Sequence, residues 1–377
     1  MNRSFEDDVP FFSVIIPCYK QADLLSAALD SLLSQDYTSW EAIVVNDGSP
    51  DNTQSVTQKN IDKDRRIKLV SKENGGLSSA RNAGLRVAKG HWFLFLDADD
   101  YILPGCLKIL YQTASNLNKE TLLQFGYRYI NLEGDRILHE TTPPSGGALI
   151  PSILSGNIGP CHSLIISRSL VSKVGYFDES LASAEDWDFW IRAAKAGAGI
   201  QKLNQILVVY RINLNSMSRQ PKTMYKAMKS VALRAVCKDE RIDPDYPLNK
   251  DYDKAISSVS IQRSFVLCLG VALVQKKIDL ACKLFQEETA FFGWKWTAEN
   301  WLPINSYLSF RYLSNRGEVR RVLSEYRSNV REFFDCIGLN KREQEQALKL
   351  IFSSHLKKRN IQKWGFAGRL FNKFLLN

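Results

Sequence analysis

Four short apolar runs in the first part of the chain alternate with patterns typical of helices. The runs cover residues 11–16, 41–45, 67–70 and 92–96, and each is followed by a polar turn. A strand, a crossover helix and a second strand within about 35 residues predict parallel pairing. Repeated units of this kind predict an α/β fold with a doubly wound, mainly parallel sheet.

The turns after these runs carry most of the reactive side chains of this part of the chain. They are Pro17–Tyr19, Asn46–Ser49, Asn74–Gly76 and Asp97–Asp100. Because the carboxyl ends of parallel strands meet at one edge of a sheet, we expect these four turns to lie together. Ligands bind at such an edge.

The last of these turns holds three carboxylates, Asp97, Asp99 and Asp100, directly after the apolar run FLFL. Carboxylates packed this closely repel one another unless they share a cation, and oxygen ligands suit Mg²⁺ or Mn²⁺ better than Zn²⁺. Such an ion would suit a substrate that carries phosphates. An exposed acidic turn before Pro104 would explain the same residues, so this motif does not decide alone.

The other turns offer groups that fit a nucleotide. Tyr19 could stack on a base, Asp47 could accept hydrogen bonds from a base or ribose, and the glycines at 48, 75 and 76 permit close approach of a ligand. Asn, Asp and Gly are also common in ordinary turns, and a tyrosine can simply pack. Taken singly, each residue has a structural explanation.

Composition limits the class of protein. With 377 residues, 45% of them hydrophobic, the chain can form a full core and two domains. Its seven cysteines are scattered without CxxC spacing, which argues against a disulfide framework and a zinc site and fits a reducing cytoplasm. The acidic N-terminus and a longest apolar run of only residues 265–274 predict neither a signal peptide nor a membrane-spanning helix.

Charge is divided unevenly along the chain. Residues 1–220 hold 22 Lys and Arg against 24 Asp and Glu, whereas residues 221–377 hold 28 against 16. The part with the acid cluster is therefore close to neutral, and we expect no nucleic-acid partner.

Four sequence blocks together resemble a known family. They are SVIIPCYKQ (13–21), VVNDGSPDNT (44–53), ENGGLSSARNAGLRVAKG (73–90) and FLDADD (95–100), and in this order and spacing they look like the N-terminal half of the family 2 glycosyltransferases. Four ordered blocks are far more specific than one DxD motif. The resemblance implies a GT-A fold and a nucleotide-sugar donor.

The resemblance also implies roles for the donor side of the site. Pro17, Tyr19, Asp47 and Arg81 match positions that hold the nucleotide, Tyr19 by stacking and the latter two by polar contacts to the base. The chain departs from many relatives at Asn46, where they have Asp.

For the DxD motif, the resemblance implies that Asp99 binds the metal directly. Asp97 would contact ribose or donor sugar and share in metal binding, and Asp100 would support both.

A later block, GYFDESLASAEDWDFWIRAAKAG (175–197), predicts a helix with Trp187 and Trp190 on one face, beginning near Glu185 and Asp186. By the residues alone, these acids could equally be caps. The resemblance makes Asp186 the base that takes the proton of the acceptor hydroxyl, with inversion at the sugar, and Glu185 a residue that positions the acceptor. We expect Asp188 to face solvent.

Two further segments bear on the metal and the diphosphate. In YRINLNSMS (210–218), Arg211 is a candidate for the diphosphate, and Asn213 stands where the family has a metal-reaching His, which puts a third protein ligand in doubt. We expect His162 to be structural or to line the acceptor site rather than to bind a metal, because no second His stands near it. The family's QxxRW motif of processive enzymes is missing after residue 200, which favours transfer of one sugar per encounter.

The remainder of the chain is predicted to be helical. Helical periodicity covers residues 224–237, 255–291 with a possible break, 318–336 and 341–356. We therefore expect a catalytic domain at 1–220 and a helical domain at 221–377. The tail, residues 355–377, has six Lys and Arg and no acid, so it could lie on an anionic membrane or dock as an ordinary terminal helix.

Together these features predict a metal-dependent, inverting glycosyltransferase. It would use Mn²⁺ or Mg²⁺ and a nucleotide sugar, with a UDP-sugar favoured by analogy, and would act on a glycan or lipid-linked acceptor in the cytoplasm or on the inner face of the membrane. A sugar nucleotidyltransferase would need a GxGTR-type loop where this chain has PCYKQ. An inactive, glycan-binding relative stays open because of Asn213, although Asp97, Asp99 and Asp186 argue against it.

Overall fold

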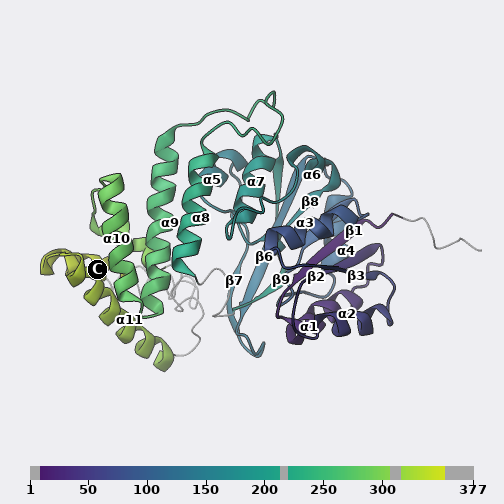
Figure 1. Ribbon diagram of the computed structural model, residues 1–377, viewed down its shortest axis with the longest axis horizontal. Helices are drawn as coiled ribbons and strands as arrows, with labels where there is room; N and C mark the ends of the chain where they lie inside the picture. The colour runs from purple at the N-terminus through teal and green to yellow at the C-terminus, as the bar shows by residue number, and fades with distance from the viewer. Residues whose placement is uncertain (1–8, 213–219, 306–315, 353–377) are drawn as a thin grey trace, which may run out of the picture. The chain divides into compact units, whose positions relative to one another are not determined.

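The computed structural model describes residues 9–212, 220–305 and 316–352 (Figure 1). The chain forms two compact units, one of Met1–Asn213 with Ser230–Ser260 and one of Leu214–Lys229 with Ile261–Asn377. The first unit thus includes a segment beyond residue 220, and the sequence-based domain boundary stays a prediction. Asn213 and the tail 355–377 lie outside the described residues.

The first unit is built on a single sheet with the strand order β3-β2-β1-β4-β8-β6-β9-β5, and β7 pairs with β6. Its parallel half consists of β1 (Phe12–Cys18), β2 (Trp40–Asp47), β3 (Ile67–Lys72) and β4 (Trp92–Phe95). Strand β1 lies between β2 and β4, with Ile15 opposite both Ile43 and Phe95. This arrangement confirms the predicted doubly wound, mainly parallel core.

The other half of the sheet is mixed. Strand β8 (Leu164–Ser167) runs antiparallel to both β4 and β6 (Thr121–Ile130), and β6 runs parallel to β9 (Gly199–Arg211). Two short strands, β5 (Tyr101–Ile102) and β7 (Ile137–Thr141), pair antiparallel with β9 and β6. Strand β9 brings Arg211 back to the loop after β4.

Helices cover both faces of the parallel strands. Val14 and Ile16 belong to one buried cluster with Leu25 and Leu29 of α1 and Leu107 of α4. The opposite face packs against α3, where a Cβ at Gly84 would lie 2.5 Å from Ile15 Cγ2. Burial on both faces explains why these strands are apolar without alternation. The helical segments are α1 (Ala22–Leu33), α2 (Thr53–Ile61), α3 (Leu77–Val87), α4 (Cys106–Ala114), α5 (Leu149–Ser155), η1 (Cys161–Ser163), α6 (Arg168–Val174) and α7 (Glu185–Lys195).

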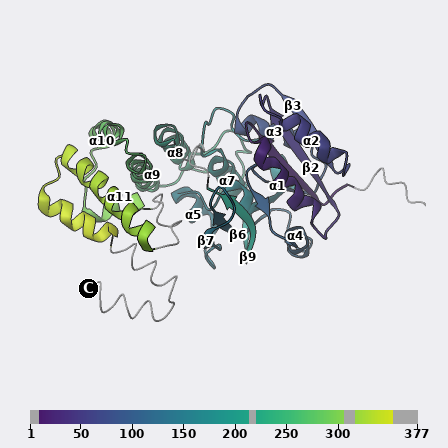
Figure 2. The same ribbon diagram turned by 90° about the horizontal axis from the view of Figure 1, so that it is seen from below.

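The described part of the second unit is helical, as predicted. Its segments come from α8 (Pro221–Ala235), α9 (Lys254–Val274), α10 (Ile278–Phe292), η3 (Ala298–Asn305) and α11 (Arg316–Cys336), and α10 lies beside α11 in both views (Figures 1 and 2). The predicted helix 255–291 is two helices that break at 275–277. Aromatic rings join them: Trp301 stacks on Trp296 with ring centroids 4.4 Å apart and lies 5.8 Å from Phe285.

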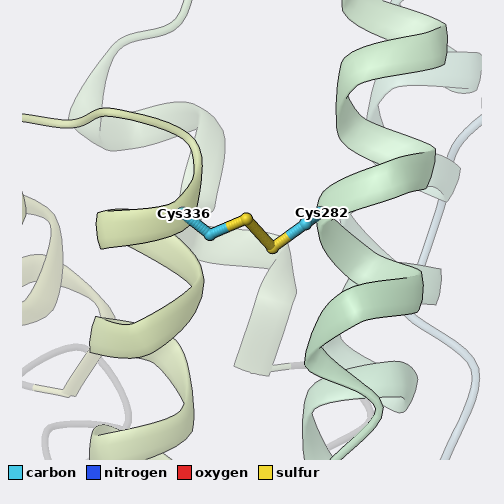
Figure 3. Close-up of a disulfide and its surroundings, with 2 residues drawn as sticks. All are labelled: Cys282 and Cys336. Atoms are coloured by element: carbon cyan, nitrogen blue, oxygen red, sulfur yellow. A yellow bond between two sulfur atoms is a disulfide. The ribbon is translucent and has the colours of Figure 1, made fainter.

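A disulfide joins two helices of this unit. Cys282 of α10 and Cys336 of α11 are bonded, with their Cα atoms 6.4 Å apart (Figure 3). The sequence analysis, which argued against a disulfide framework, did not anticipate this bond. The two cysteines are 54 residues apart, and only the packing of α10 on α11 brings them together.

Helix α9 bears on the expectation that no segment of the chain spans a membrane. By length and composition, α9 could cross a bilayer, because its best window has a mean hydropathy of 1.6. However, 67% of that window is buried within the protein, and buried core helices pass the same test. The sequence analysis counted only the uninterrupted run 265–274 and so did not flag this helix.

Candidate active site

Parallel pairing brings the predicted turns to one edge of the sheet. The last pairs of the register, Cys18 with Asn46 and Asp47 with Lys72, place the ends of β1, β2 and β3 side by side. Strand β4 pairs with β1 on its other side and leads into the acidic loop. The sheet therefore gathers the groups that the sequence analysis assigned to a nucleotide and a metal.

Asp47 is buried and held by the loop before α3. Its carboxylate accepts hydrogen bonds from Lys72 Nζ at 2.8 Å and from the backbone N–H groups of Gly75 and Gly76 at 3.0 and 2.8 Å. Gly76 adopts φ +86°, a conformation that favours glycine. The predicted contact of Asp47 with a base would therefore compete with Lys72 for this carboxylate.

Asn46, where many relatives have Asp, takes part in the turn after β2. Its Oδ1 accepts a hydrogen bond from Ser49 N at 2.8 Å, which closes the turn. Gly48 in this turn has φ +66°, and a Cβ there would lie 2.7 Å from Asn74 N. An amide at position 46 thus supports the local fold without a charge.

Tyr19 and Pro17 lie at the end of β1 in different surroundings. Tyr19 is 43% exposed, and Lys20 Nζ lies 5.1 Å from its ring centroid, so the ring is accessible to a planar ligand. Pro17 is buried in the strand opposite Val45. Of the two, only Tyr19 offers a free face for stacking.

Arg81 lies between the acidic loop and helix α7. The residue is only 2% exposed, and its guanidinium donates to Glu185 Oε1 at 2.5 Å and to Asp97 Oδ1 at 2.9 Å. Burial alone would lower the pKa of Arg81, but the nearby carboxylates, including Asp186, raise it above its ordinary value. The sequence analysis assigned Arg81 to the base, whereas here both Nη atoms have carboxylate partners.

The acidic loop is buried and crowded with charge. Asp100 accepts a hydrogen bond from Arg211 N at 2.8 Å, and Arg211 Nη1 donates to the carbonyl oxygen of Asp99 at 3.0 Å. Burial, and then the charges of Asp100 and Asp97, raise the pKa of Asp99 to about 8. A divalent cation would relieve this repulsion, so the residues fit a metal site.

The side chains that lie close enough to share an ion are Asp97, Asp100 and His162. One potential ligand atom from each lies within 4.8 Å of the other two. In the described part of the chain, Asp99 is outside this group, and its role as a direct ligand stays a prediction. His162 comes from η1, which the sequence analysis placed before a strand but did not connect with the acids.

Helix α7 begins at Glu185, as predicted, and presents Asp186 in its first turn. The residue before it, Ala184, has φ +58°, which is strained for a side chain other than glycine. Asp186 accepts hydrogen bonds from Trp187 N at 2.7 Å and from Asn157 Nδ2 at 3.0 Å.

Asp186 also has a shifted pKa. Burial, and then the charge of Glu185, raise its pKa to about 7, while Arg81 and Asn157 oppose the rise. A carboxylate with a pKa near neutrality can accept a proton at cellular pH and return it to solvent.

Asp188 does not face solvent, contrary to the sequence-based expectation. It is 2% exposed and pairs with Arg192 in its own helix at 3.2 Å and with Arg241 at 2.9 Å. Arg241 belongs to the segment 230–260 that packs within the first unit. Helical periodicity alone could not show that this segment covers the outer face of α7.

The structure adds residues that the sequence analysis did not assign. Asn157 donates a hydrogen bond to Asp186. The only feature of the sequence that could have indicated Asn157 is its place in the short loop SGNIG, between two glycines. Tyr127, Tyr129 and Tyr210 form an aromatic wall beside His162, whose ring centroid lies 4.8 Å from that of Tyr210 and 6.2 Å from that of Tyr127. Tyr129 lies 5.1 Å from Tyr210 and completes the wall.

Comparisons with known proteins agree with this geometry. The family model described as Glycosyl transferase family 2 matches residues 13–174. An uncharacterized glycosyltransferase of Bacillus subtilis, EpsJ, is 31% identical over 56% of this chain, and the match covers 64% of its own length. The uncharacterized glycosyltransferase RP339 of Rickettsia prowazekii is 32% identical over 62% of this chain and 74% of its own length.

A solved structure supports the fold. A mannosyltransferase of Pyrobaculum calidifontis, in complex with GDP-Man and Mn²⁺, is 17% identical, with a TM-score of 0.51 over 91% of this chain and 87% of its own. This likeness concerns the fold alone. With the sequence matches and the arrangement of the sheet edge, it leads to one conclusion: the chain has a GT-A fold and belongs to glycosyltransferase family 2.

Proposed function

We propose that this protein is a metal-dependent, inverting glycosyltransferase that transfers one sugar from a nucleotide sugar to an acceptor hydroxyl. The observation that carries the proposal is the link between Asp186 and the acid cluster. Asp186, with a pKa of about 7, follows Glu185, and Glu185 is bonded through Arg81 to Asp97. A candidate proton acceptor and a candidate metal site are thereby linked through the buried pair of Arg81 and Glu185.

The donor would bind across the carboxyl edge of the sheet. Tyr19 would stack on the base, and Asp47 would accept a hydrogen bond from it. Asp97 and Asp99 would hold the divalent cation, Mn²⁺ or Mg²⁺, with Arg211 beside them for the diphosphate. When bound, the cation supplies positive charge for the departing nucleoside diphosphate.

The acceptor would react beside helix α7. Its hydroxyl oxygen forms the new bond to the anomeric carbon as the bond from that carbon to the diphosphate oxygen breaks, and Asp186 takes the hydroxyl proton. Attack from the face opposite the leaving group inverts the configuration. Glu185, which the resemblance assigns to positioning the acceptor or its neighbour, would act as a positioning residue through its ion pair with Arg81.

The test of this proposal has to identify the sugar donor and the acceptor. A UDP-sugar is the first donor to examine by analogy with the family, and GDP-mannose belongs in the same screen because the structural relative is in complex with it. The proposed acceptor is a glycan or a lipid-linked glycan. A lipid-linked acceptor would place the protein at the inner face of the membrane.

The experiment is a donor screen by thermal shift and by hydrolysis of UDP-, GDP- and dTDP-sugars, with and without Mn²⁺. Wild type is compared with Asp99→Ala, Asp186→Asn and the control Asp30→Asn, an exposed acid on α1. We expect one nucleotide sugar to stabilise wild type in a metal-dependent way. Asp99→Ala should lose this stabilisation, and Asp186→Asn should keep binding but lose hydrolysis.

Two outcomes would contradict the proposal. If no nucleotide sugar binds, the transferase assignment fails and the inactive, glycan-binding relative becomes the better explanation. If Asp186→Asn retains hydrolysis at the wild-type rate, the base lies elsewhere.

A further inference from the structure

We propose that His162 is a direct nitrogen ligand of the divalent cation and that it makes the site prefer Mn²⁺ or Co²⁺ over Mg²⁺. Asp97 and Asp100 would supply oxygen ligands beside it, together with Asp99 as proposed above. This inference rests on the metal dependence of the proposed function and assigns that site a ligand and a metal preference.

The spacing of the ligand atoms supports a shared ion. His162 Nδ1 lies 2.9 Å from Asp100 Oδ2 and 3.9 Å from Asp97 Oδ2. Neighbouring ligands of an octahedral cation with bonds of about 2.1 Å lie about 3 Å apart. The three side chains therefore need only small movements to meet around one ion.

The facing atoms of His162 and Asp100 are not bonded to any third group among the described residues. His162 is 1% exposed, its Nδ1 lies 2.9 Å from Asp100 Oδ2, and its Nε2 has no hydrogen-bond partner among the described residues. Asp100 Oδ2 is likewise without an aligned donor in this part of the chain, although Nδ1 is close. A buried nitrogen and oxygen this close can share either a proton or a cation, and no other described group is bonded to these two atoms.

The surroundings hold the imidazole in place. Tyr210 meets its ring edge-on at 4.8 Å with an interplanar angle of 81°, and Tyr127 does so at 6.2 Å with an angle of 75°. Residue 162 follows Pro160 in the turn η1, directly before strand β8. A ring fixed between a strand and two tyrosines is pre-organised for coordination.

The sequence provides a reason for a nitrogen ligand from this element. The closing segment carries Asn213, an amide and a poor ligand, so the chain needs a donor from another place. Imidazole favours transition metals such as Co²⁺, and Mn²⁺ accepts it more readily than Mg²⁺, which favours carboxylate and water oxygens. A site with His162 should therefore discriminate between these metals.

The test is a metal-binding measurement without donor or acceptor. Bound Mn²⁺ is titrated by electron paramagnetic resonance, and its nitrogen coupling is recorded by electron spin echo envelope modulation, with and without ¹⁵N-labelled histidine. His162→Gln removes the imidazole, and His91→Gln changes an exposed histidine as the control. Mg²⁺ affinity is obtained by competition.

We expect wild type and His91→Gln to show histidine nitrogen coupling that changes with the label. His162→Gln should lose the coupling and bind Mn²⁺ about 10- to 100-fold more weakly, with Mg²⁺ affinity nearly unchanged. If His162→Gln fails to fold, the wild-type protein with ¹⁵N-labelled histidine shows by itself whether a histidine nitrogen binds the Mn²⁺.

Bound Mn²⁺ without nitrogen coupling, or coupling that persists in His162→Gln, would overturn the inference. No Mn²⁺ binding would overturn it as well. Failure of the proposed transfer is a separate result, because inactivity with every donor would leave the wild-type Mn²⁺ spectrum as it is.

Discussion

The guanidinium of Arg81 and the carboxylate of Glu185 lie 2.5 Å apart, although the two residues are separated by 104 positions in the sequence. Through its other Nη atom, Arg81 also reaches Asp97 at 2.9 Å. One buried side chain therefore connects the acidic loop with the helix that carries Asp186. The position of Asp186, the candidate base, therefore depends on the ion pair of Arg81 and Glu185. The sugar donor and the sugar acceptor need not contact this pair.

Removing one partner of this pair should be costly. Glu185→Gln leaves a buried guanidinium with only Asp97, and we expect a loss of about 3 kcal/mol or more in the free energy of unfolding. The double variant Arg81→Met with Glu185→Gln should lose less than the sum of the single changes, because it buries no unpaired guanidinium. Urea unfolding of the three variants gives these values.

The matched control is an exposed pair. Asp36 and Lys108 lie 3.3 Å apart with side chains 54% and 58% exposed, so Asp36→Asn should change the unfolding free energy by less than about 1 kcal/mol. If Asp36→Asn and Glu185→Gln lower the free energy of unfolding equally, the buried pair stabilises the fold no more than an exposed pair does.

Asn157 should set the pH dependence of transfer. Its amide donates to the ionised form of Asp186 and lowers a pKa that is about 7 in the intact site. In Asn157→Ala this pKa should rise by about one unit, since a hydrogen bond to a charged group contributes about 1.5 kcal/mol. The acidic limb of the kcat/KM profile should move to higher pH by that amount.

The control for this profile is Asn116→Ala, a change on the exposed surface. An unshifted acidic limb in Asn157→Ala would mean that Asp186 is not the group whose ionisation limits the reaction.

Asp186→Asn should stabilise the metal-free protein at high pH. Because the pKa of Asp186 is raised from 3.8 to about 7 in the folded state, that state binds its proton more tightly than the unfolded chain does. Ionisation therefore lowers stability as the pH rises from about 4 through about 7, and the amide escapes this loss.

Melting curves at several pH values test this expectation. The difference in Tm between Asp186→Asn and wild type should be near zero at about pH 4 and reach several degrees at about pH 8. A constant difference across this range would contradict the raised pKa.

The disulfide of the second unit can be counted chemically. Denatured, unreduced protein should show five thiols, because Cys282 and Cys336 are bonded, and reduced protein should show seven. Closing a 54-residue loop stabilises a fold by about 4 kcal/mol in the chain-entropy estimate, so Cys282→Ser should unfold this unit at lower denaturant. Seven thiols before reduction would mean that Cys282 and Cys336 are not bonded and that all seven cysteines are free, as the sequence analysis expected.

Local patterns made the sheet predictable. The runs at 11–16 and 92–96 became β1 and β4 because short apolar segments between turns have few alternatives to a buried strand. Exposed polar residues such as Gln201 and Gln205 interrupt the apolar pattern in the first half of β9, so the pattern does not show that this strand begins at Gly199. Strand β7 was missed for the same reason.

The candidate site was less predictable where partners come from distant segments. The place of Asp97 after β4 and that of Asp186 in the first turn of α7 followed from strand and helix ends. The partners of Arg81, the burial of Asp188 and the approach of His162 to Asp100 depend on how α7, η1 and the segment 230–260 pack. Periodicity shows which residues share a helix face, but it does not identify what covers that face.

The return of residues 230–260 to the first unit has a consequence for how such chains can be cut and exchanged. Arg234 and Arg241, which pair with Asp178 and Asp188, follow a stretch that belongs to the second unit. A truncation at residue 220 would strip these arginines from buried acids. Because each unit is made of two separate segments of the chain, no single crossover point exchanges one unit whole and leaves the other intact.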